Sequence, residues 1–600
     1  MKFPIALDFE TEPIDPKTPD RAPSPVGLAI LEPGKRGHYY AFGHPSGNNC
    51  EEVEARHRYR DAVRSDRGTV FHNAPFDLAV GERHWLEPFP RPDKFHDTMI
   101  LLWLANPYIW LDLKGAAARY CGFPNEEELE LKRWILANVP EMKGKRSGWK
   151  KYIARAPGDV VAPYAIGDVE RTLALWKELR PVLNAMPHRY LEERRVLEPV
   201  WWMGVQGIPI DVKGLERFEV QGHKALHELA VSLRRSLRAG HIDLGKRGQV
   251  ADALEARGWV HPDRWIRTGK SRQRSTNIHD LAKVCSNPRF VASWERYQLL
   301  SHMLSTFVLP WLEREEGGRI YVGWDTVRGL DEQGRSRGAK TGRLASSPNV
   351  QNISKTEIEN EEEEDPFPSL RDFVRSGVRG SLVCGDLSQQ EPRITAHFAG
   401  GALAQAYRDN PRLDAHTEVA VDMSRVSGRG IHRSVGKTLN LAVTYALGLD
   451  ALAARLGTDR ATATAARDLW RRARPDVVRL DLALRRRWAQ GLPITTWGGA
   501  EVYVEESVGD RTWEYRALNT LIQRSGAEQL KALICHWHEE HIDLGELILT
   551  AHDELVVETA TRRVRETRKT LQSTLELELG FSVPFVADVG SGKSWGKAKP

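Results

Sequence analysis

The strongest constraint on the fold is a run of apolar and β-branched residues at 547–559, LILTAHDELVVET, that is broken in its middle by His552, Asp553 and Glu554. In one continuous strand, neighbouring side chains point to opposite faces, so two adjacent carboxylates cannot share a surface. The pattern therefore predicts two strands joined by a tight turn at the charged residues. Charged turns are common on protein surfaces, so this one becomes a site only if another part of the chain supplies further groups.

A second pattern of carboxylates opens the chain, in FPIALDFETEP at residues 3–13. Apolar residues at 5, 7 and 9 alternate with Asp8 and Glu10, so a strand here places both acids on one face. An ordinary edge strand with a polar face has the same pattern. The two acids therefore need further ligands before they indicate a site.

Further acids follow within the length of one domain. In FHNAPFDLAV, Asp77 comes after an asparagine and a phenylalanine at the start of a helix-like run. In VAPYAIGDVERTLALW, Tyr164 lies four residues before Asp168, so the two share one face of a helix. With the two acids of the opening strand these make four carboxylates, which suit two hard divalent cations because such ions prefer oxygen ligands. The tyrosine is suited to orient an attacking water.

This ordered set, D-x-E, then N-x-x-F-D, then Y-x-x-x-D, resembles the three motifs of the DEDDy 3'-5' exonucleases. The resemblance implies that residues 1–185 form a ribonuclease H-like exonuclease domain, a mixed sheet with covering helices. It also implies that two metal ions are held by four acids and that Tyr164 positions the water. The implied metal ligands are Asp8, Glu10, Asp77 and Asp168.

Composition indicates which kinds of partner, metal site and cellular compartment the sequence favours. Its 600 residues suggest several domains, and lysine plus arginine (86) barely exceed aspartate plus glutamate (81), so charge alone does not indicate a polyanion partner. The five cysteines form no metal-ligand spacing, which favours a reducing compartment and no zinc site. Because no stretch is apolar enough for a signal peptide or a membrane span, we expect a cytoplasmic protein, in the host cytoplasm if phage-encoded, with no membrane partner.

The second half carries another acid and a helical stripe. In GSLVCGDLSQQEPR, an apolar strand at 381–385 ends at Asp386, before a helix that begins near Gln389. An N-cap aspartate would give the same pattern. Farther on, a helical stripe has one residue every four positions. It begins with two cations, Arg433 and Lys437, and continues with Leu441 and Tyr445. Such a stripe suits a triphosphate followed by its sugar and base.

Here the chain resembles the family A DNA polymerases, such as bacterial polymerase I and its phage relatives. KTGRLASSPNVQNI, DLSQQEPR, RSVGKTLNLAVTYA, NTLIQRSGAEQ and AHDE match that family's elements in order along the chain. The resemblance implies an α/β and α+β multidomain protein in which a right-hand polymerase follows the exonuclease domain. Its expected parts are a connector and thumb (186–318), the first part of the palm (319–400), the fingers (401–500) and the second part of the palm (501–600).

The same resemblance implies roles for individual residues. Asp386 and Asp553 hold two Mg²⁺ ions, with Mn²⁺ as an alternative here and at the exonuclease site, and Glu554 lies on the outer side of the metals. Lys437 acts in catalysis and in nucleotide binding. The other nucleotide-binding residues are Gln389, Glu391, His416, Arg433, Leu441 and Tyr445, with Glu391 excluding a ribose 2'-hydroxyl and Tyr445 stacking near the templating base.

Primer-template DNA and dNTPs are the expected partners of a monomeric enzyme; no processivity factor or replisome protein is identified. Implied DNA contacts are Arg343, Asn352, Asn519, Gln523 and His552. A basic loop, IRTGKSRQRSTN, adds Arg267 and Lys270 as phosphate contacts, although a solvated surface loop has the same composition.

The sequence departs from the family in three places. Leu441 replaces a phenylalanine or tyrosine, Ala446 replaces a glycine, and no 5' nuclease domain precedes the exonuclease motifs. Two other functions compete with a DNA polymerase. A 3'-5' nuclease whose C-terminal region only binds nucleic acid would need neither Asp386 with Asp553 nor the cationic stripe. A single-subunit RNA polymerase is disfavoured by Glu391 and by the exonuclease motifs.

Overall fold

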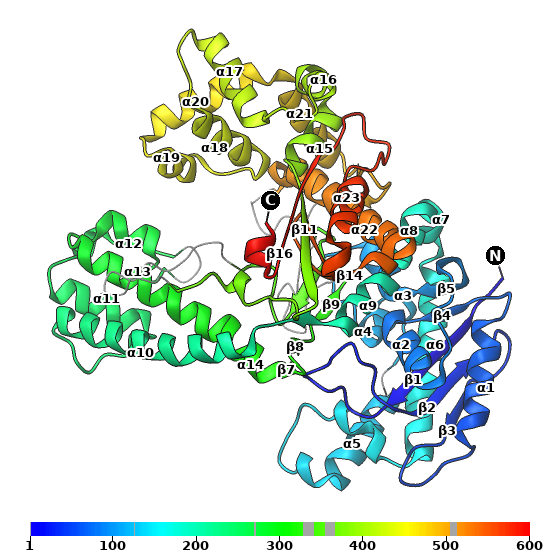
Figure 1. Cartoon of the computed structure of the whole chain (residues 1–600). Helices are drawn as coiled ribbons and strands as arrows, with labels where there is room; N and C mark the ends of the chain where they lie inside the picture. The colour runs from blue at the N-terminus through cyan, green and yellow to red at the C-terminus, as the bar shows by residue number, and fades with distance from the viewer. Residues whose placement is uncertain are drawn as a thin grey trace.

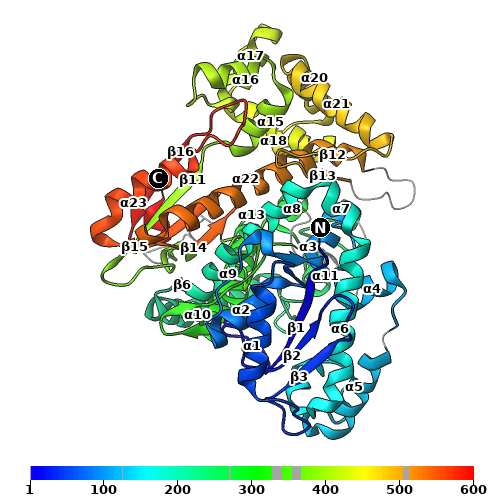
Figure 2. The same cartoon turned by 90° about the vertical axis from the view of Figure 1, so that its right-hand side faces the viewer.

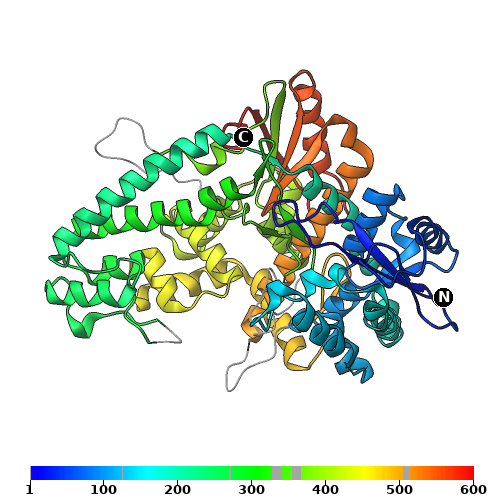
Figure 3. The same cartoon turned by 90° about the horizontal axis from the view of Figure 1, so that it is seen from below.

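The computed structural model describes residues 2–124, 126–268, 272–327, 341–353, 367–503 and 513–599. An N-terminal α/β unit, a central antiparallel sheet and two helical arms make up the molecule (Figure 1). Seen from below, the N-terminal unit lies on one side and both helical arms lie on the other (Figure 3). Among the described residues, no helix has the length and apolar character needed to cross a membrane.

The N-terminal unit is built on a five-stranded mixed sheet of order β3-β2-β1-β4-β5. β1 (Ile5–Thr11) pairs antiparallel with β2 (Pro25–Leu31), which pairs antiparallel with β3 (His38–Ala41). On its other edge β1 is parallel to β4 (Thr69–Phe71), and β4 is parallel to β5 (Phe95–Asp97). The mixed sheet expected from the sequence is therefore present, with β1 at its centre.

Helices cover this sheet and carry the remaining sequence motifs. The long helix α6 (Gly158–Glu178) packs against β1, β2 and β3, as Figure 2 shows, and α4 (Leu113–Cys121) packs against α6. The other helices of the unit are α1 (Glu52–Val63), α2 (Ala74–Trp85), α3 (Thr98–Ala105), α5 (Glu126–Asn138) and α7 (Arg180–Ala185). Their buried apolar side chains form one continuous core with the strands.

The central sheet has the order β14-β15-β11-β16, and every neighbouring pair is antiparallel. β14 (Glu546–Ala551) and β15 (Glu554–Ala560) form a hairpin in which Ala551 pairs with Glu554. The turn is therefore His552 and Asp553, with His552 in a left-handed conformation (φ 61°). The tight turn predicted from the sequence is confirmed.

The inner strand β11 (Gly380–Leu387) lies between β15 and β16 (Ala587–Gly592). It extends farther than the predicted 381–385, because Asp386 pairs in the ladder with Glu554 and with Asp588. Asp386 is thus a strand residue and not an N-cap, while α15 (Gln390–Ala399) begins after a left-handed residue, Gln389 (φ 57°). Helices α22 (Ala517–His541), α23 (Val564–Leu575) and α24 (Trp595–Ala598) complete this part.

One helical arm follows the connector helices α8 (Pro187–Arg195) and α9 (Leu197–Gln206). A break at Gly207 (φ 66°) leads through β6 (Ile208–Pro209) into α10. The arm comprises α10 (Val212–Leu237), α11 (Arg247–Ala256), α12 (Ile278–Val284), α13 (Pro288–Met303) and α14 (Leu309–Arg314). Its outer half has a separate apolar core.

The second arm lies above the central sheet in Figure 1 and is entirely helical up to a short ribbon. It comprises α16 (Gly401–Asp409), α17 (Ala415–Ser427), α18 (Arg433–Thr444), α19 (Leu449–Leu456), α20 (Arg460–Ala473) and α21 (Pro475–Ala489). The ribbon pairs β12 (Ile494–Thr495) with β13 (Glu501–Val502). The first arm is joined to the central sheet by the short strands β7 (Glu315–Glu316), β8 (Arg319–Ile320), β9 (Gly323–Asp325) and β10 (Ala345–Ser347).

Candidate functional site

A cluster of carboxylates lies on the N-terminal sheet beneath α6. Alternation along β1 directs Asp8 and Glu10 to the same face, and α6 adds Asp168. One carboxylate oxygen from each of these residues lies within 4.8 Å of the others, an arrangement that can hold a metal ion. Burial and mutual repulsion raise the pKa of Asp8 well above its ordinary value and raise the pKa of Glu10 to about 8. A bound cation would therefore offset the repulsion among these carboxylates.

Asp77 lies beside this cluster in the first turn of α2. Its Oδ1 accepts a hydrogen bond of 2.8 Å from the backbone N–H of Phe9, so α2 is fixed directly to the strand that carries the other acids. Burial raises the pKa of Asp77 to about 8, and the charge of Asp77 in turn raises the pKa of Asp8. Three of the four predicted ligands are therefore gathered closely, and Asp77 adjoins them.

Two buried cations complete the N-terminal cluster, and the sequence interpretation assigned neither of them. Lys114 Nζ lies 3.3 Å from Asp168 Oδ1 and 3.6 Å from the centre of the Tyr164 ring. Arg171, one turn after Asp168, lies 3.5 Å from the same oxygen. Tyr164 is buried, and its pKa is raised well above the ordinary value by burial and by the acids, so it remains a phenol.

A second pair of carboxylates lies in the central sheet. Asp386 is near the end of β11, and Asp553 is in the turn of the β14–β15 hairpin. The backbone N–H of Leu387 donates a 3.2 Å hydrogen bond to the carbonyl of Asp553, which joins the turn to the end of β11. Burial and the neighbouring Asp386 raise the pKa of Asp553 to about 8, against the opposing charge of Arg343. Folding thus brings together two acids that lie far apart in the sequence.

Glu554 is held inside the central sheet. Its carboxylate is buried, with Arg371 Nη1 3.1 Å away and Cys384 Sγ 2.6 Å away, and it also accepts a hydrogen bond from the indole of Trp595. Its position on the outer side of the metals stays a prediction, because a carboxylate with these partners keeps lone pairs for other ligands. Glu554 fixes the hairpin to β11 and α24, which supports the turn that carries Asp553.

The predicted cationic stripe lies on α18. Arg433 and Lys437 are exposed, Leu441 is half-buried, and Tyr445 follows the last helical residue as the C-cap. The Arg433 guanidinium pairs with Asp414, the N-cap of α17, and this contact helps to hold the pKa of Asp414 at about 2.

His416 stands beside these cations. Burial lowers its pKa, and the nearby charges of Arg433 and Lys437 lower it further, although Asp414 opposes them. The predicted nucleotide-binding cations and this histidine therefore share one region.

Glu391 connects three of the predicted site residues. Arg343 Nη2 donates to its carboxylate at 2.9 Å, and the hydroxyl of Tyr445 donates to the same group at 2.9 and 3.0 Å. The glutamate is thus held rigidly between the segment before β10 and the end of α18. Gln523 on α22 reaches the same tyrosine, which brings a predicted DNA contact into the group.

Gln389 anchors the second arm to the central sheet through its side chain. Its Oε1 accepts hydrogen bonds from Tyr407 and from the backbone N–H of Ala415, and its Nε2 donates to the carbonyl of Leu413. The amide keeps a second N–H donor, and nucleotide binding by Gln389 stays a prediction.

A cavity of about 320 Å³ lies beside the central acids. It is lined by three of the predicted DNA contacts, Arg343, Asn352 and His552, together with residues of α22 that include Lys531. Of the remaining predicted contacts, Asn519 lies on α22, and Arg267 lies on the first arm, where its guanidinium donates to the carbonyl of Arg272. Lys270 lies outside the described residues.

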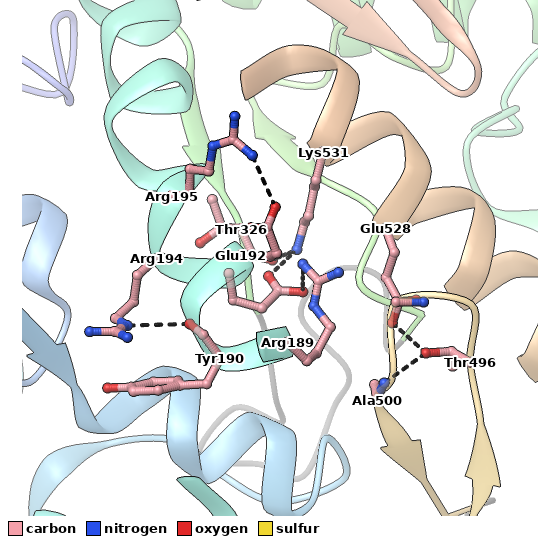
Figure 4. Close-up of polar contacts among 12 residues, drawn as sticks. Arg189, Tyr190, Glu192, Arg194, Arg195, Thr326, Thr496, Ala500, Glu528 and Lys531 are labelled. Atoms are coloured by element: carbon pink, nitrogen blue, oxygen red, sulfur yellow. Dashed lines mark hydrogen bonds and ion pairs between the residues drawn. The ribbon is translucent and has the colours of Figure 1, made fainter. Parts of the chain in front are cut away.

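A buried network of charges attaches α22 to the connector (Figure 4). Lys531 of α22 points toward α8, where its ammonium bonds Glu193 at 2.6 Å and the carbonyl of Thr326 at 3.0 Å. Arg189 of α8 lies 3.2 Å from the same glutamate, and Glu528 of α22 accepts from Thr496 at 2.8 Å. Breaking one partner of such a buried pair is strongly destabilising. The network therefore fixes the cavity wall to the connector helix α8.

The sequence is similar to a family of known proteins. The model of DNA polymerase family A matches residues 212–597. DNA polymerase I of Chloroflexus aurantiacus is 27% identical over 467 residues, covering 74% of this chain and 48% of that protein. The thermostable DNA polymerase I of Thermus thermophilus is 26% identical, covering 90% of this chain and 60% of that protein. The chain thus spans about half the length of the first of these relatives.

A phage protein and a solved structure match this chain over nearly the whole length of both chains. The DNA-directed DNA polymerase of Pseudomonas phage M6 is 25% identical, covering 99% of this chain and 94% of that protein. The POL domain of Pol1 from M. smegmatis, in complex with DNA primer-template and dNTP, has a TM-score of 0.77 over 100% of this chain and 96% of that one, at 19% identity. The fold is therefore shared along the whole length.

Proposed function

The chain belongs to DNA polymerase family A, and we propose that it extends the 3' end of a DNA primer with dNTPs, copying a template, and removes nucleotides from a 3' end at a second site. The observation that carries the first activity is the convergence of Asp386 and Asp553 in the central sheet, together with a helix of the second arm that bears Arg433 and Lys437. Two acids and a cationic helix suit phosphoryl transfer, in which positioning and charge neutralisation provide most of the catalysis.

In this proposal the parts of the molecule correspond to those of a right hand. The central sheet is the palm, formed by residues 319–400 and 501–600, the first helical arm with its connector (186–318) is the thumb, and the second arm (401–500) is the fingers. Residues 1–185 form the ribonuclease H-like exonuclease domain. Two of these limits are supported by breaks between elements, because α7 ends at Ala185 and α16 begins at Gly401.

The carboxylates of both sites fit divalent metal ions. Each cluster gathers acids whose pKa values are raised by burial and mutual repulsion, and carboxylate oxygens are the ligands that Mg²⁺ prefers. Asp386 and Asp553 would hold Mg²⁺ or Mn²⁺ at one site, and Asp8, Glu10, Asp77 and Asp168 would hold it at the other. When bound, the ion supplies activation of the attacking oxygen and neutralisation of phosphate charge.

Side chains of the fingers bind the nucleotide in this proposal. Arg433, Lys437 and His416 hold the triphosphate, with Lys437 also placed to donate a proton as the leaving group departs. Arg433 would exchange its contact with Asp414 for phosphate, or share it, because the guanidinium has five donors. Leu441 then faces the sugar.

Glu391 acts as the gate against ribonucleotides. Because Arg343 and Tyr445 hold its carboxylate, it presents a fixed wall to the position of a 2'-hydroxyl. Primer-template DNA lies along the cavity lined by Arg343, Asn352 and His552, with Asn519 and Gln523 on α22 facing the duplex and Arg267 on the thumb contacting backbone phosphates.

Removal of 3' nucleotides rests on the N-terminal cluster. β1 and α6 gather Asp8, Glu10 and Asp168, Asp77 adjoins them, and Tyr164 keeps its hydroxyl proton, so it can orient a water for attack on a phosphodiester. This activity is independent of the palm carboxylates, because the two sets lie in separate parts of the molecule.

Primer extension with dNTPs and with rNTPs in parallel tests the proposal. Extension by dNTPs only, lost in Asp553→Asn and kept in Asp8→Ala/Glu10→Ala, is the expected result. Equal use of rNTPs would favour an RNA polymerase. Degradation of 3' ends without any extension would favour a nuclease that only binds nucleic acid through its C-terminal region.

A further inference from the structure

Lys114 is a buried cation inside the N-terminal acid cluster. It lies at the second position of α4, and its side chain is only 8% exposed. A cation in the first turn of a helix opposes the helix dipole, and a buried ammonium loses hydration, so both effects disfavour this placement. Neighbouring acids must compensate for them.

The contacts of Lys114 converge on two predicted site residues. Its Nζ lies 3.3 Å from Asp168 Oδ1, 3.5 Å from Glu128 Oε2 and 3.6 Å from the centre of the Tyr164 ring. An ammonium over an aromatic face is attracted by the ring, more strongly when it is desolvated. One buried cation thus bridges the tyrosine and a carboxylate that lie one turn apart on α6.

Packing of α4 against α6 delivers the lysine to this position. Ala116 and Ala117 are fully buried and small, so α4 can approach α6 closely, and Asp112 caps the helix by accepting from the N–H of Gly115 at 2.7 Å. The direction in which Lys114 leaves α4 is therefore fixed by the start of the helix. Its Nζ is held there by the two carboxylates and by the ring.

We propose that Lys114 is a positioning residue of the N-terminal site, which holds Tyr164 and Asp168 in register and supplies a fixed positive charge among its carboxylates. This inference rests on the proposed 3'-5' exonuclease function. Without the lysine, the tyrosine ring loses the cation on its face, and Asp168 keeps the ion pair with Arg171 at 3.5 Å. The water-orienting hydroxyl would then be less well placed, while the strand bearing Asp8 and Glu10 stays in place.

The first test is the rate at which the full chain degrades a labelled single-stranded oligonucleotide from its 3' end, with no dNTP present. In Lys114→Met we expect kcat to fall by a factor of tens or more and KM to change by less than about threefold, because the lysine positions reacting groups and does not bind the strand. Lys114→Arg should recover part of kcat. Lys150→Met is the matched control, since Lys150 pairs with Glu128 at 3.4 Å and is 60% exposed, and its charge lowers the pKa of Asp168 less than the charge of Lys114 does.

A second test needs no turnover and separates this inference from the exonuclease function. We expect Lys114→Met to lower the melting temperature in EDTA and to increase the rise that Mg²⁺ produces, because the acids lose their internal counter-charge. Equal losses with and without Mg²⁺ would show a merely structural lysine and overturn the assignment, as would wild-type kcat in Lys114→Met. If the wild-type chain degrades no 3' end, the exonuclease function fails, while the Mg²⁺-dependent difference still reports whether Lys114 balances the cluster.

Discussion

The two acid clusters obtain positive charge in different ways. In the N-terminal cluster, Lys114 and Arg171 are buried and lie within 3.5 Å of Asp168. In the central sheet, Arg343 lowers the pKa of Asp553, but the predicted nucleotide-binding cations Arg433 and Lys437 are exposed on a separate helical arm. The first cluster carries its own counter-charge, whereas the second brings acids and cations together around a bound nucleotide in the proposed function. Packing alone brings cations to the N-terminal cluster, whereas in the proposed function a bound nucleotide contacts both the acids and the cations of the second site.

The largest expected effect tests whether the two clusters are independent. Asp553→Asn should reduce extension about a thousandfold or more and leave 3' degradation unchanged, because loss of a metal ligand removes several kcal/mol of transition-state stabilisation. Asp8→Ala/Glu10→Ala should do the reverse. Single-turnover extension and 3' degradation, each measured on all three proteins, check this. Loss of both activities in either variant with an unchanged circular dichroism spectrum would contradict the separation.

A second prediction tests whether Glu391 faces the sugar of a bound nucleotide in the proposed polymerase site. Glu391→Ala should reduce selectivity for dNTP over rNTP by about a hundredfold, because it removes the carboxylate that Arg343 and Tyr445 hold in place. Single-turnover incorporation of each nucleotide measures the ratio. The matched control is Tyr445→Phe, which keeps the ring and loses one hydrogen bond to Glu391, so its effect should be smaller. An unchanged ratio in Glu391→Ala would remove the glutamate from the sugar-facing wall.

A third prediction concerns Leu441, which is half-buried on α18. A dideoxynucleotide lacks the 3'-hydroxyl, and leucine offers no polar atom to replace it, so the native protein should disfavour chain terminators. In Leu441→Tyr the phenol can supply one hydrogen bond of about 1 kcal/mol, a gain of several-fold in terminator use. Competition between ddNTP and dNTP decides the matter. If the larger ring only disturbs packing, both nucleotides lose equally.

The smallest expected effect compares the clusters by pH. Without metal, the pKa values of Glu10, Asp77 and Asp553 are each raised to about 8, so the folded chain binds more protons than the unfolded chain between about pH 4 and 8. Stability from these groups is present below their unfolded pKa values and is lost as pH rises toward 8. Calorimetry in EDTA should show a melting temperature that falls by a few degrees over this range.

The two clusters should contribute unequally to that slope. Asp8→Asn/Glu10→Gln should flatten it more than Asp553→Asn, because more carboxyl groups have raised pKa values in the N-terminal cluster. Mg²⁺ should flatten it in the wild-type chain, since metal competes with protons for the acids. A slope that is equal in all variants would place the titrating groups elsewhere.

Local patterns predicted much of the fold. Alternation in residues 5–11 predicted β1, the charged break at 552–554 predicted the hairpin, and four-residue spacing predicted α18 and the shared face of Tyr164 and Asp168. The errors were small and occurred at ends, where β11 extends through Asp386 and α18 ends before Tyr445. Pattern reasoning performs well here because side-chain periodicity is a property of each segment alone.

Family resemblance, and not periodicity, joined Asp386 to Asp553 before the fold was known. The fold added contacts that no pattern predicted, since Glu554 contacts Arg371, Cys384 and Trp595, and the amide of Gln389 anchors the second arm.

By itself, the sequence determined which segments become strands and helices and which faces carry acids or cations, because those properties depend on neighbours a few residues apart. Tertiary structure alone decided that Lys114 enters the acid cluster and that Lys531, in the wall of the cavity beside the central acids, joins Glu193. Each of these contacts joins segments that are distant in the chain. Such a contact forms only when packed helices bring the charges together and exclude water, and no local pattern encodes that arrangement.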